Sequence, residues 1–130
     1  MILALRTDAP EAELYLYDAG GRIEKITWMA HRELSSTVLT KIDELLASHK
    51  HELSELTGLL VYRGPGSFTG LRIGVSVMNS LSYSLGIPLV GATGPEWLES
   101  GLKEFSSKSL SPSLVVPEYG GEAHITKPRK

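Results

Sequence analysis

The apolar and polar residues of the chain form short apolar runs first and helical periodicity later. The runs over Ile2–Arg6, Ala12–Asp18 and Arg22–Ala30 predict three strands. Ala19-Gly20-Gly21 lies between the second and third runs and supplies a hairpin turn. The first part of the chain therefore predicts an antiparallel meander.

The second part alternates between helical and strand patterns. Residues 34–49 place their apolar positions on one arc, and Ser35 or Ser36 is the expected helix cap. Thr69–Leu85 and Pro95–Phe105 predict two further helices. The strands expected between them are Gly58–Tyr62 and Ile87–Gly91.

This order of elements predicts the fold class. Strands that alternate with helices require a partly parallel sheet with right-handed crossovers. A three-stranded meander followed by helix, strand, helix, strand and helix is the order of a ribonuclease-H-like lobe of the actin/Hsp70 kinase type. We expect a single α/β lobe with a five-stranded mixed sheet flanked by helices.

The second helix has a wider apolar surface than one sheet face requires. One stripe contains Leu71, Val75, Met78 and Leu85, and a second stripe is well separated from it. The helix could pack between the sheet and a neighbouring helix, or it could also contact another protein. The second interpretation is preferred, and the expected partner interface combines both long helices: Leu39, Ile42, Leu46, Ile73, Val77, Met78 and Leu81.

Composition restricts the function classes. The chain has 130 residues, 42% of them hydrophobic, a net charge of −2 and no cysteine. These values fit one ordinary domain, exclude disulfides and thiol catalysis, and argue against a strong nucleic-acid surface. The apolar opening stops at Arg6, which is too short for a signal peptide, so a cytoplasmic protein without membrane contact is expected.

A glycine-rich loop joins the fourth strand to the second helix. Four glycines and a proline lie in residues 63–74, where a tight bend leaves backbone N–H groups free to receive a phosphate or another chain. Leu71 and Arg72 follow Gly70, so the Lys-Ser/Thr pair of a Walker loop is missing, and the glycine spacing also differs from the dinucleotide fingerprint. The candidate loop residues are Gly64, Pro65, Gly66, Ser67, Phe68, Thr69, Gly70 and Arg72.

The word Gly-Pro-Gly-Ser-Phe-Thr-Gly-Leu-Arg-Ile-Gly at 64–74 resembles the signature of the TsaB (YeaZ) family. Similar words occur at 42–46, 53–56 and 86–91, so the resemblance covers roughly residues 1–105. It implies an accessory subunit in the synthesis of threonylcarbamoyladenosine beside the anticodon of tRNA. It also implies pairing of the first two helices with TsaD, an additional TsaE-like ATPase, and contact with tRNA only through the complex.

The chain departs from the family pattern at the end of the first strand. Arg6 stands where the family has the acidic residue of the kinase-type phosphate and metal site. A guanidinium cannot hold Mg²⁺ or act as a base, and pairing with Asp8 is the simpler role. We therefore expect no catalytic residue, no resident metal and no cofactor in this chain, with room for ATP or ADP and Mg²⁺ only at a boundary with the partner.

Other candidate groups carry no recognisable catalytic pattern. The four histidines, at positions 31, 49, 51 and 124, lack metal-ligand spacing. Ser67 has no G-x-S-x-G context, and with Thr69 it is expected to cap the second helix. Phe68 is either a core residue or a partner anchor. Arg72 could bind a phosphate or a carboxylate of the same chain or of a partner.

The family usually has a second lobe, and here residues 1–105 form the only predicted lobe. Residues 106–130 are expected to be a linker and C-terminal tail, with Ser-rich residues 106–113 as the flexible part. Words at 117–119 and 126–130 resemble the family's C-terminus, which would make the chain a natural minimal version; a disordered basic tail is the alternative. Lys127, Arg129 and Lys130 add little charge for tRNA.

Two functions from different classes remain. The first is a non-catalytic scaffold that pairs with TsaD and dimerises when isolated, because the exposed helix surface would be self-complementary. The alternative is a small ATP-binding phosphotransferase or ATPase that uses the glycine-rich loop. Arg6, the missing loop lysine and the missing lobe all argue against the alternative.

Overall fold

The computed structural model describes residues 1–30, 33–66, 68–107 and 115–116. Strands β1 (Ile2–Arg6), β2 (Glu11–Asp18) and β3 (Gly21–Met29) form the antiparallel meander. Within these ranges the remaining elements are α1 (Leu34–Ser48), the 3-10 turn η2 (Leu53–Glu55), β4 (Gly58–Gly64), α2 (Phe68–Leu85), β5 (Leu89–Thr93) and α3 (Trp97–Ser107). The predicted element order is confirmed, apart from η2, which was not predicted.

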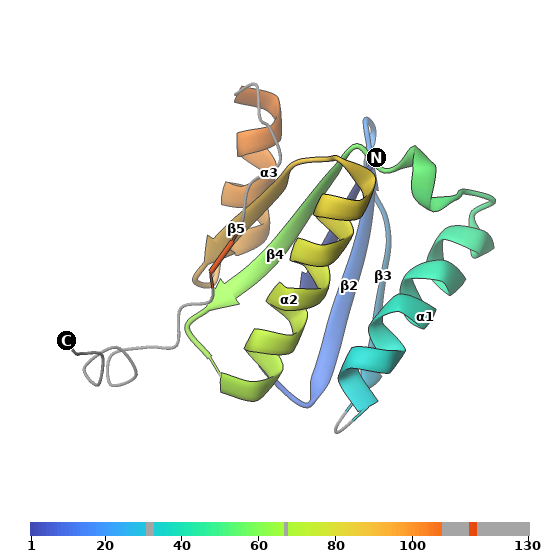
Figure 1. The fold of residues 1–130 in the computed structure, drawn as a ribbon. Coiled ribbons are helices and arrows are strands. Elements are labelled where there is room, and N and C mark those ends of the chain that lie inside the picture. The colour runs from blue at the N-terminus through green and yellow to red at the C-terminus, as the bar shows by residue number, and fades with distance from the viewer. Residues whose placement is uncertain (31–32, 67, 108–114, 117–130) are drawn as a thin grey trace.

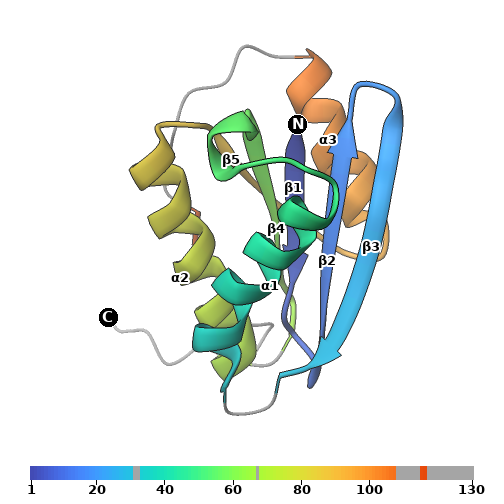
Figure 2. The ribbon, with the colours of Figure 1, turned by 90° about the vertical axis from the view of Figure 1, so that its right-hand side faces the viewer.

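The five strands form one mixed sheet of order β3-β2-β1-β4-β5. β1 is antiparallel to β2 and parallel to β4, and β4 is parallel to β5. Helices α1 and α2 lie side by side on one face of the sheet, and α3 covers the other (Figures 1 and 2). The predicted ribonuclease-H-like lobe with helices on both faces is therefore confirmed.

Two apolar clusters hold the layers together. The larger one joins the sheet to α1 and α2 and contains fully buried Leu3, Leu5, Leu14, Val38 and Ile42. The smaller one lies under α3 and is centred on Trp97, whose indole makes edge contacts with the rings of Tyr15 and Tyr62. β1 and β4 are buried on both faces, as their unbroken apolar runs predict.

Several predicted boundaries differ from the structure by one or two residues, and one predicted cap is wrong. Helix α1 starts after Glu33 without a side-chain cap, and the hydroxyl of Ser36 donates back to the Glu33 carbonyl, so the predicted serine cap is wrong. β5 begins at Leu89 and not at Ile87; the Pro88 carbonyl accepts from the Leu59 amide, but Pro88 has no N–H with which to continue the pairing. Helix α3 runs from Trp97 to Ser107, whereas a helix over Pro95–Phe105 was predicted.

Candidate functional site

The glycine-rich loop is held by contacts within the chain. Gly64 ends β4 with φ of 129°, a conformation that only glycine adopts easily, and is followed by a cis bond to Pro65. The phenol of Tyr62 donates to the Pro65 carbonyl at 2.7 Å. A Cβ atom at Gly66 would lie 2.5 Å from Cβ of Asp8. The glycines thus let the loop lie directly on the segment that follows β1.

The glycines at the start of α2 let this helix approach the segment after β1 equally closely. The hydroxyl of Thr7 donates to the Gly70 carbonyl at 2.7 Å, and a Cβ atom at Gly74 would lie 2.0 Å from that hydroxyl oxygen. Thr69 and Arg72 are exposed beside them. Of the other predicted loop residues, Ser67 lies outside the described part of the chain, and Phe68 is the first residue of α2.

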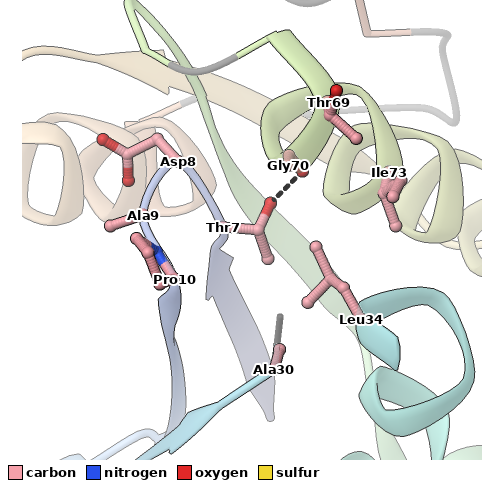
Figure 3. Close-up of a pocket in the computed structure, with 9 residues that line it drawn as sticks. All are labelled: Thr7, Asp8, Ala9, Pro10, Ala30, Leu34, Thr69, Gly70 and Ile73. Atoms are coloured by element: carbon pink, nitrogen blue, oxygen red, sulfur yellow. Dashed lines mark hydrogen bonds between the residues drawn. The ribbon is translucent and has the colours of Figure 1, made fainter. Parts of the chain in front are cut away.

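A pocket of about 240 Å³ opens where β1 ends and α2 begins (Figure 3). Its polar contributors are Thr7, Asp8 and Thr69, and the rest of its wall is mainly hydrocarbon. None of these three side chains is positively charged, and a hydrocarbon wall offers phosphate groups no hydrogen bonds. The lining is Thr7, Asp8, Ala9, Pro10, Ala30, Leu34, Thr69, Gly70 and Ile73, so this pocket does not suit a polyphosphate.

Arg6 is paired with Asp8, the carboxylate at this pocket. Its Nε and Nη2 donate to the two carboxylate oxygens of Asp8 at 2.7 and 3.1 Å, which confirms the predicted pairing. Hydrogen bonding to Asp8 raises the pKa of the Arg6 guanidinium, against the effect of its partial burial. Arg6 also lies over the ring of Tyr62, 3.9 Å from its centroid. Because Arg6 occupies both oxygens of the Asp8 carboxylate and places a positive charge beside it, the residues here do not fit Mg²⁺.

Elsewhere in the described ranges, no cluster of histidine, aspartate and glutamate could hold a metal ion. His49 is hydrogen-bonded to Glu24 on β3, and His51 to Glu55 of η2. His31 and His124 lie outside the described residues. The hydrogen bond to His51, with that to the Glu52 amide, lowers the pKa of Glu55.

Part of the predicted partner interface is wrong. Ile42, Leu46 and Met78 have exposed fractions of 0%, 2% and 0%, and all three belong to the chain's own core. The reason is that α1 and α2 pack beside each other on the sheet (Figure 2), which buries these three residues in the larger apolar cluster. Ile73 is half-buried and lines the pocket near Thr7 instead.

The other predicted interface residues meet between the two helices, although Leu81 is buried in the core with 8% of its surface exposed. Leu39 from α1 and Val77 and Leu81 from α2 line a groove of about 340 Å³ between the two helices. Leu39 is 48% exposed. The rest of the lining was not predicted and consists of Ser76, Ser80 and Ser84. Their spacing of four residues places them on one line of the helix, which is the signal that could have identified them.

These features define the class of protein: a single kinase-type lobe whose glycine-rich loop is used for internal packing. The family model for TsaD, tRNA N6-adenosine threonylcarbamoyltransferase, matches residues 4–121, and the chain belongs to this family. Its sequence and structural neighbours place it with the TsaB/YeaZ-like proteins.

The relatives show the extent of the similarity. The chain is 33% identical over 89 residues to the Haemophilus influenzae tRNA threonylcarbamoyladenosine biosynthesis protein TsaB, covering 68% of this chain and 37% of that protein. It is 31% identical over 107 residues to the Geotalea uraniireducens tRNA N6-adenosine threonylcarbamoyltransferase, covering 82% of this chain and 30% of that enzyme. The chain therefore spans about a third of the length of these relatives.

The solved structures agree with the fold. YeaZ from Pseudomonas aeruginosa superposes with a TM-score of 0.64 at 26% identity, over 71% of this chain and 42% of that one. A second structure, described as similar to the peptidase YeaZ, has a TM-score of 0.69 at 24% identity, covers 82% of this chain and 48% of that chain, and supports the fold alone. None of the described helices has the length and apolar character needed to cross a bilayer.

Proposed function

We propose that the chain is a non-catalytic accessory subunit for threonylcarbamoyladenosine synthesis on tRNA. In this proposal it presents the groove between α1 and α2 to a larger relative of the TsaD type. The observation that supports this proposal most directly is the groove, in which exposed Leu39 and partly exposed Val77 flank a line of serines. Relatives named as TsaB biosynthesis proteins support the pathway.

The chemistry of the groove suits a helical partner. Ser76, Ser80 and Ser84 have short side chains, which let a second helix approach closely, since the distance between helices depends on the residues at the contact. Leu39 and Val77 provide apolar contact beside them. The same face would allow the isolated chain to form a symmetric homodimer.

The assignment as non-catalytic rests on Arg6 and Asp8. Their two hydrogen bonds occupy the carboxylate that could otherwise hold a metal ion. Transfer of the threonylcarbamoyl group would then occur in the TsaD-type partner, with a TsaE-like ATPase as the third protein. Any ATP or ADP and Mg²⁺ would lie at a subunit boundary, and tRNA would be bound through the complex.

The phosphotransferase alternative has no support in the relatives or in the pocket near Thr7. Calorimetry separates the two functions. We expect no binding of ATP with Mg²⁺ to the isolated chain, whereas binding at micromolar concentrations would favour the alternative.

The groove is tested by Val77→Glu in a co-purification with a TsaD protein from the same organism. A carboxylate in an apolar contact loses its hydration, so we expect the variant to lose the partner. Ser100→Glu adds the same charge to exposed α3 on the opposite face of the sheet and should retain the partner. Both variants should keep the wild-type circular dichroism spectrum. Retention of the partner by a folded Val77→Glu variant would contradict the proposal.

A further inference from the structure

A short piece of the C-terminal region lies against the outer flank of α2. Val115 and Val116 are described, and Figure 1 shows them as the short red segment beside β5. The amide of Val115 donates to Oδ1 of Asn79 at 2.9 Å, and its carbonyl accepts from Nδ2 of Asn79 at 2.8 Å. One side chain therefore satisfies both backbone groups of one residue.

This contact recognises backbone conformation. The N–H and C=O groups of one residue point the same way only in an extended chain, as in a hydrogen-bonded pair of an antiparallel ladder. The carboxamide of Asn79 has one acceptor and one donor side and can substitute for a neighbouring strand. Arg63 adds a bond from Nη1 to the Val116 carbonyl at 3.2 Å. Two side chains from α2 and β4 thus hold an extended segment.

The valine side chain occupies a hollow made by a glycine. A Cβ atom at Gly91 on β5 would lie 2.6 Å from Cγ1 of Val115 and 2.7 Å from Cδ of Arg63. Val115 is partly buried and packs against the larger apolar cluster. Helix α2 contacts β4 more than β5, so Val115 covers sheet surface at Gly91 of β5.

We propose that Asn79, Arg63 and Gly91 form a receptor for an extended β-branched segment, and that its occupant is Val115–Val116 of the same chain. Binding within one chain is favoured because only residues 108–114 separate the segment from the end of α3. Such a short connection gives an effective concentration in roughly the millimolar range. The segment acts as a latch that covers the sheet surface beside Gly91 and holds Val115 and Val116 on the flank of α2.

The latch and the groove use different sides of α2. Asn79 faces the segment, whereas Val77 and Ser80 face α1 across the groove. Loss of the latch should therefore leave the partner surface unchanged. The two proposals fail independently, because one is measured at the Val115 amide and the other by co-purification.

Hydrogen exchange of the full chain, followed by NMR at the Val115 amide, tests the latch. We expect protection in the wild type and at least a tenfold loss of it in Asn79→Ala, with β4 and β5 amides unchanged. Gly91→Val fills the hollow without removing a hydrogen bond and should release the segment as well. The matched control is Tyr83→Ala, one turn further along α2, where the side chain is 90% exposed and protection should persist.

Two outcomes would overturn the proposal. One is a Val115 amide that exchanges in the wild type as fast as in an unstructured peptide, or equally slowly in Asn79→Ala and Gly91→Val. The other is protection that disappears on dilution, since that would place the segment on a second copy.

Discussion

The hydroxyl of Thr7 and the α-carbon of Gly74 are so close that a methyl group on Gly74 would lie 2.0 Å from the hydroxyl oxygen. Thr7 follows β1, and Gly74 lies in the second turn of α2. Thr7 is 1% exposed, and its hydroxyl is engaged with the Gly70 carbonyl. The glycines of the loop region therefore fix how closely α2 approaches the central strand.

Gly74→Ala should destabilise the chain. The added methyl displaces Thr7 and its hydrogen bond, and overpacking of this kind costs about 1–3 kcal/mol, against a gain of at most about 1 kcal/mol in helix propensity. Urea unfolding measures the difference. Thr7→Ala combined with Gly74→Ala should recover part of the loss, because the clashing oxygen is removed. Equal stability of Gly74→Ala and wild type would mean that α2 can move away from β1 without cost.

The Arg6–Asp8 pair should contribute modestly to stability. A double-mutant cycle with Arg6→Ala and Asp8→Ala is expected to give a coupling free energy of about 1 kcal/mol, because both side chains remain partly exposed. Arg6→Lys should not restore the coupling, since an ammonium group cannot make the bidentate hydrogen bond to Asp8 or stack on the ring of Tyr62 as a guanidinium does. A coupling near zero, or full rescue by lysine, would show that the pair adds little.

Adjacent positions on α2 should respond very differently to truncation. Met78→Ala removes a side chain with no exposed surface and is expected to cost about 2–5 kcal/mol of unfolding free energy. Val77→Ala trims a side chain at the groove and should cost less than about 1 kcal/mol. Denaturant midpoints with unchanged slopes would establish the ranking. A larger loss for Val77→Ala would mean that the groove is closed within the free chain.

The fold was predictable because each element carries its own local signal. The apolar runs of β1 and β4, the glycine turn before β3 and the apolar arc of α1 each indicate one element without knowledge of the others. The family word at residues 64–74 then placed the loop between β4 and α2 correctly. Pairing of Arg6 with Asp8 was predictable for the same reason, since the two residues are close in sequence.

The groove between α1 and α2 was predicted only in part, because a helical projection shows which residues share a face and does not show what that face packs against. Met78 and Val77 are both apolar, and only the packing of α1 beside α2 decides which of them faces the sheet. The Thr7–Gly70 contact and the Asn79–Val115 contact join residues far apart in sequence. No local pattern specifies such pairs, so the internal use of the loop glycines and the latch required the three-dimensional structure.

Alkaline pH should reveal the buried phenol of Tyr15. Burial raises the pKa of Tyr15 well above its ordinary value of 10.0, and the hydrogen bond to Glu13 adds to the shift. The folded state therefore holds the proton more tightly than the unfolded state does. The resulting stabilisation is complete below about pH 10 and is lost as the pH rises above that value.

Tyr15→Phe should remove part of this pH dependence. At neutral pH the variant loses the hydrogen bond to Glu13 and should be less stable by about 1 kcal/mol. Above about pH 10 its unfolding free energy should fall less steeply than that of the wild type, because one group with a shifted pKa is gone. The pKa of Tyr17 is also raised by burial, so the variant's unfolding free energy should still decrease somewhat with rising pH. Urea unfolding between pH 8 and about pH 11, with phenolate absorbance followed in parallel, measures both effects. If the unfolding free energies of the variant and the wild type fell equally steeply with pH, Tyr15 would ionise in the folded protein as it does in the unfolded chain.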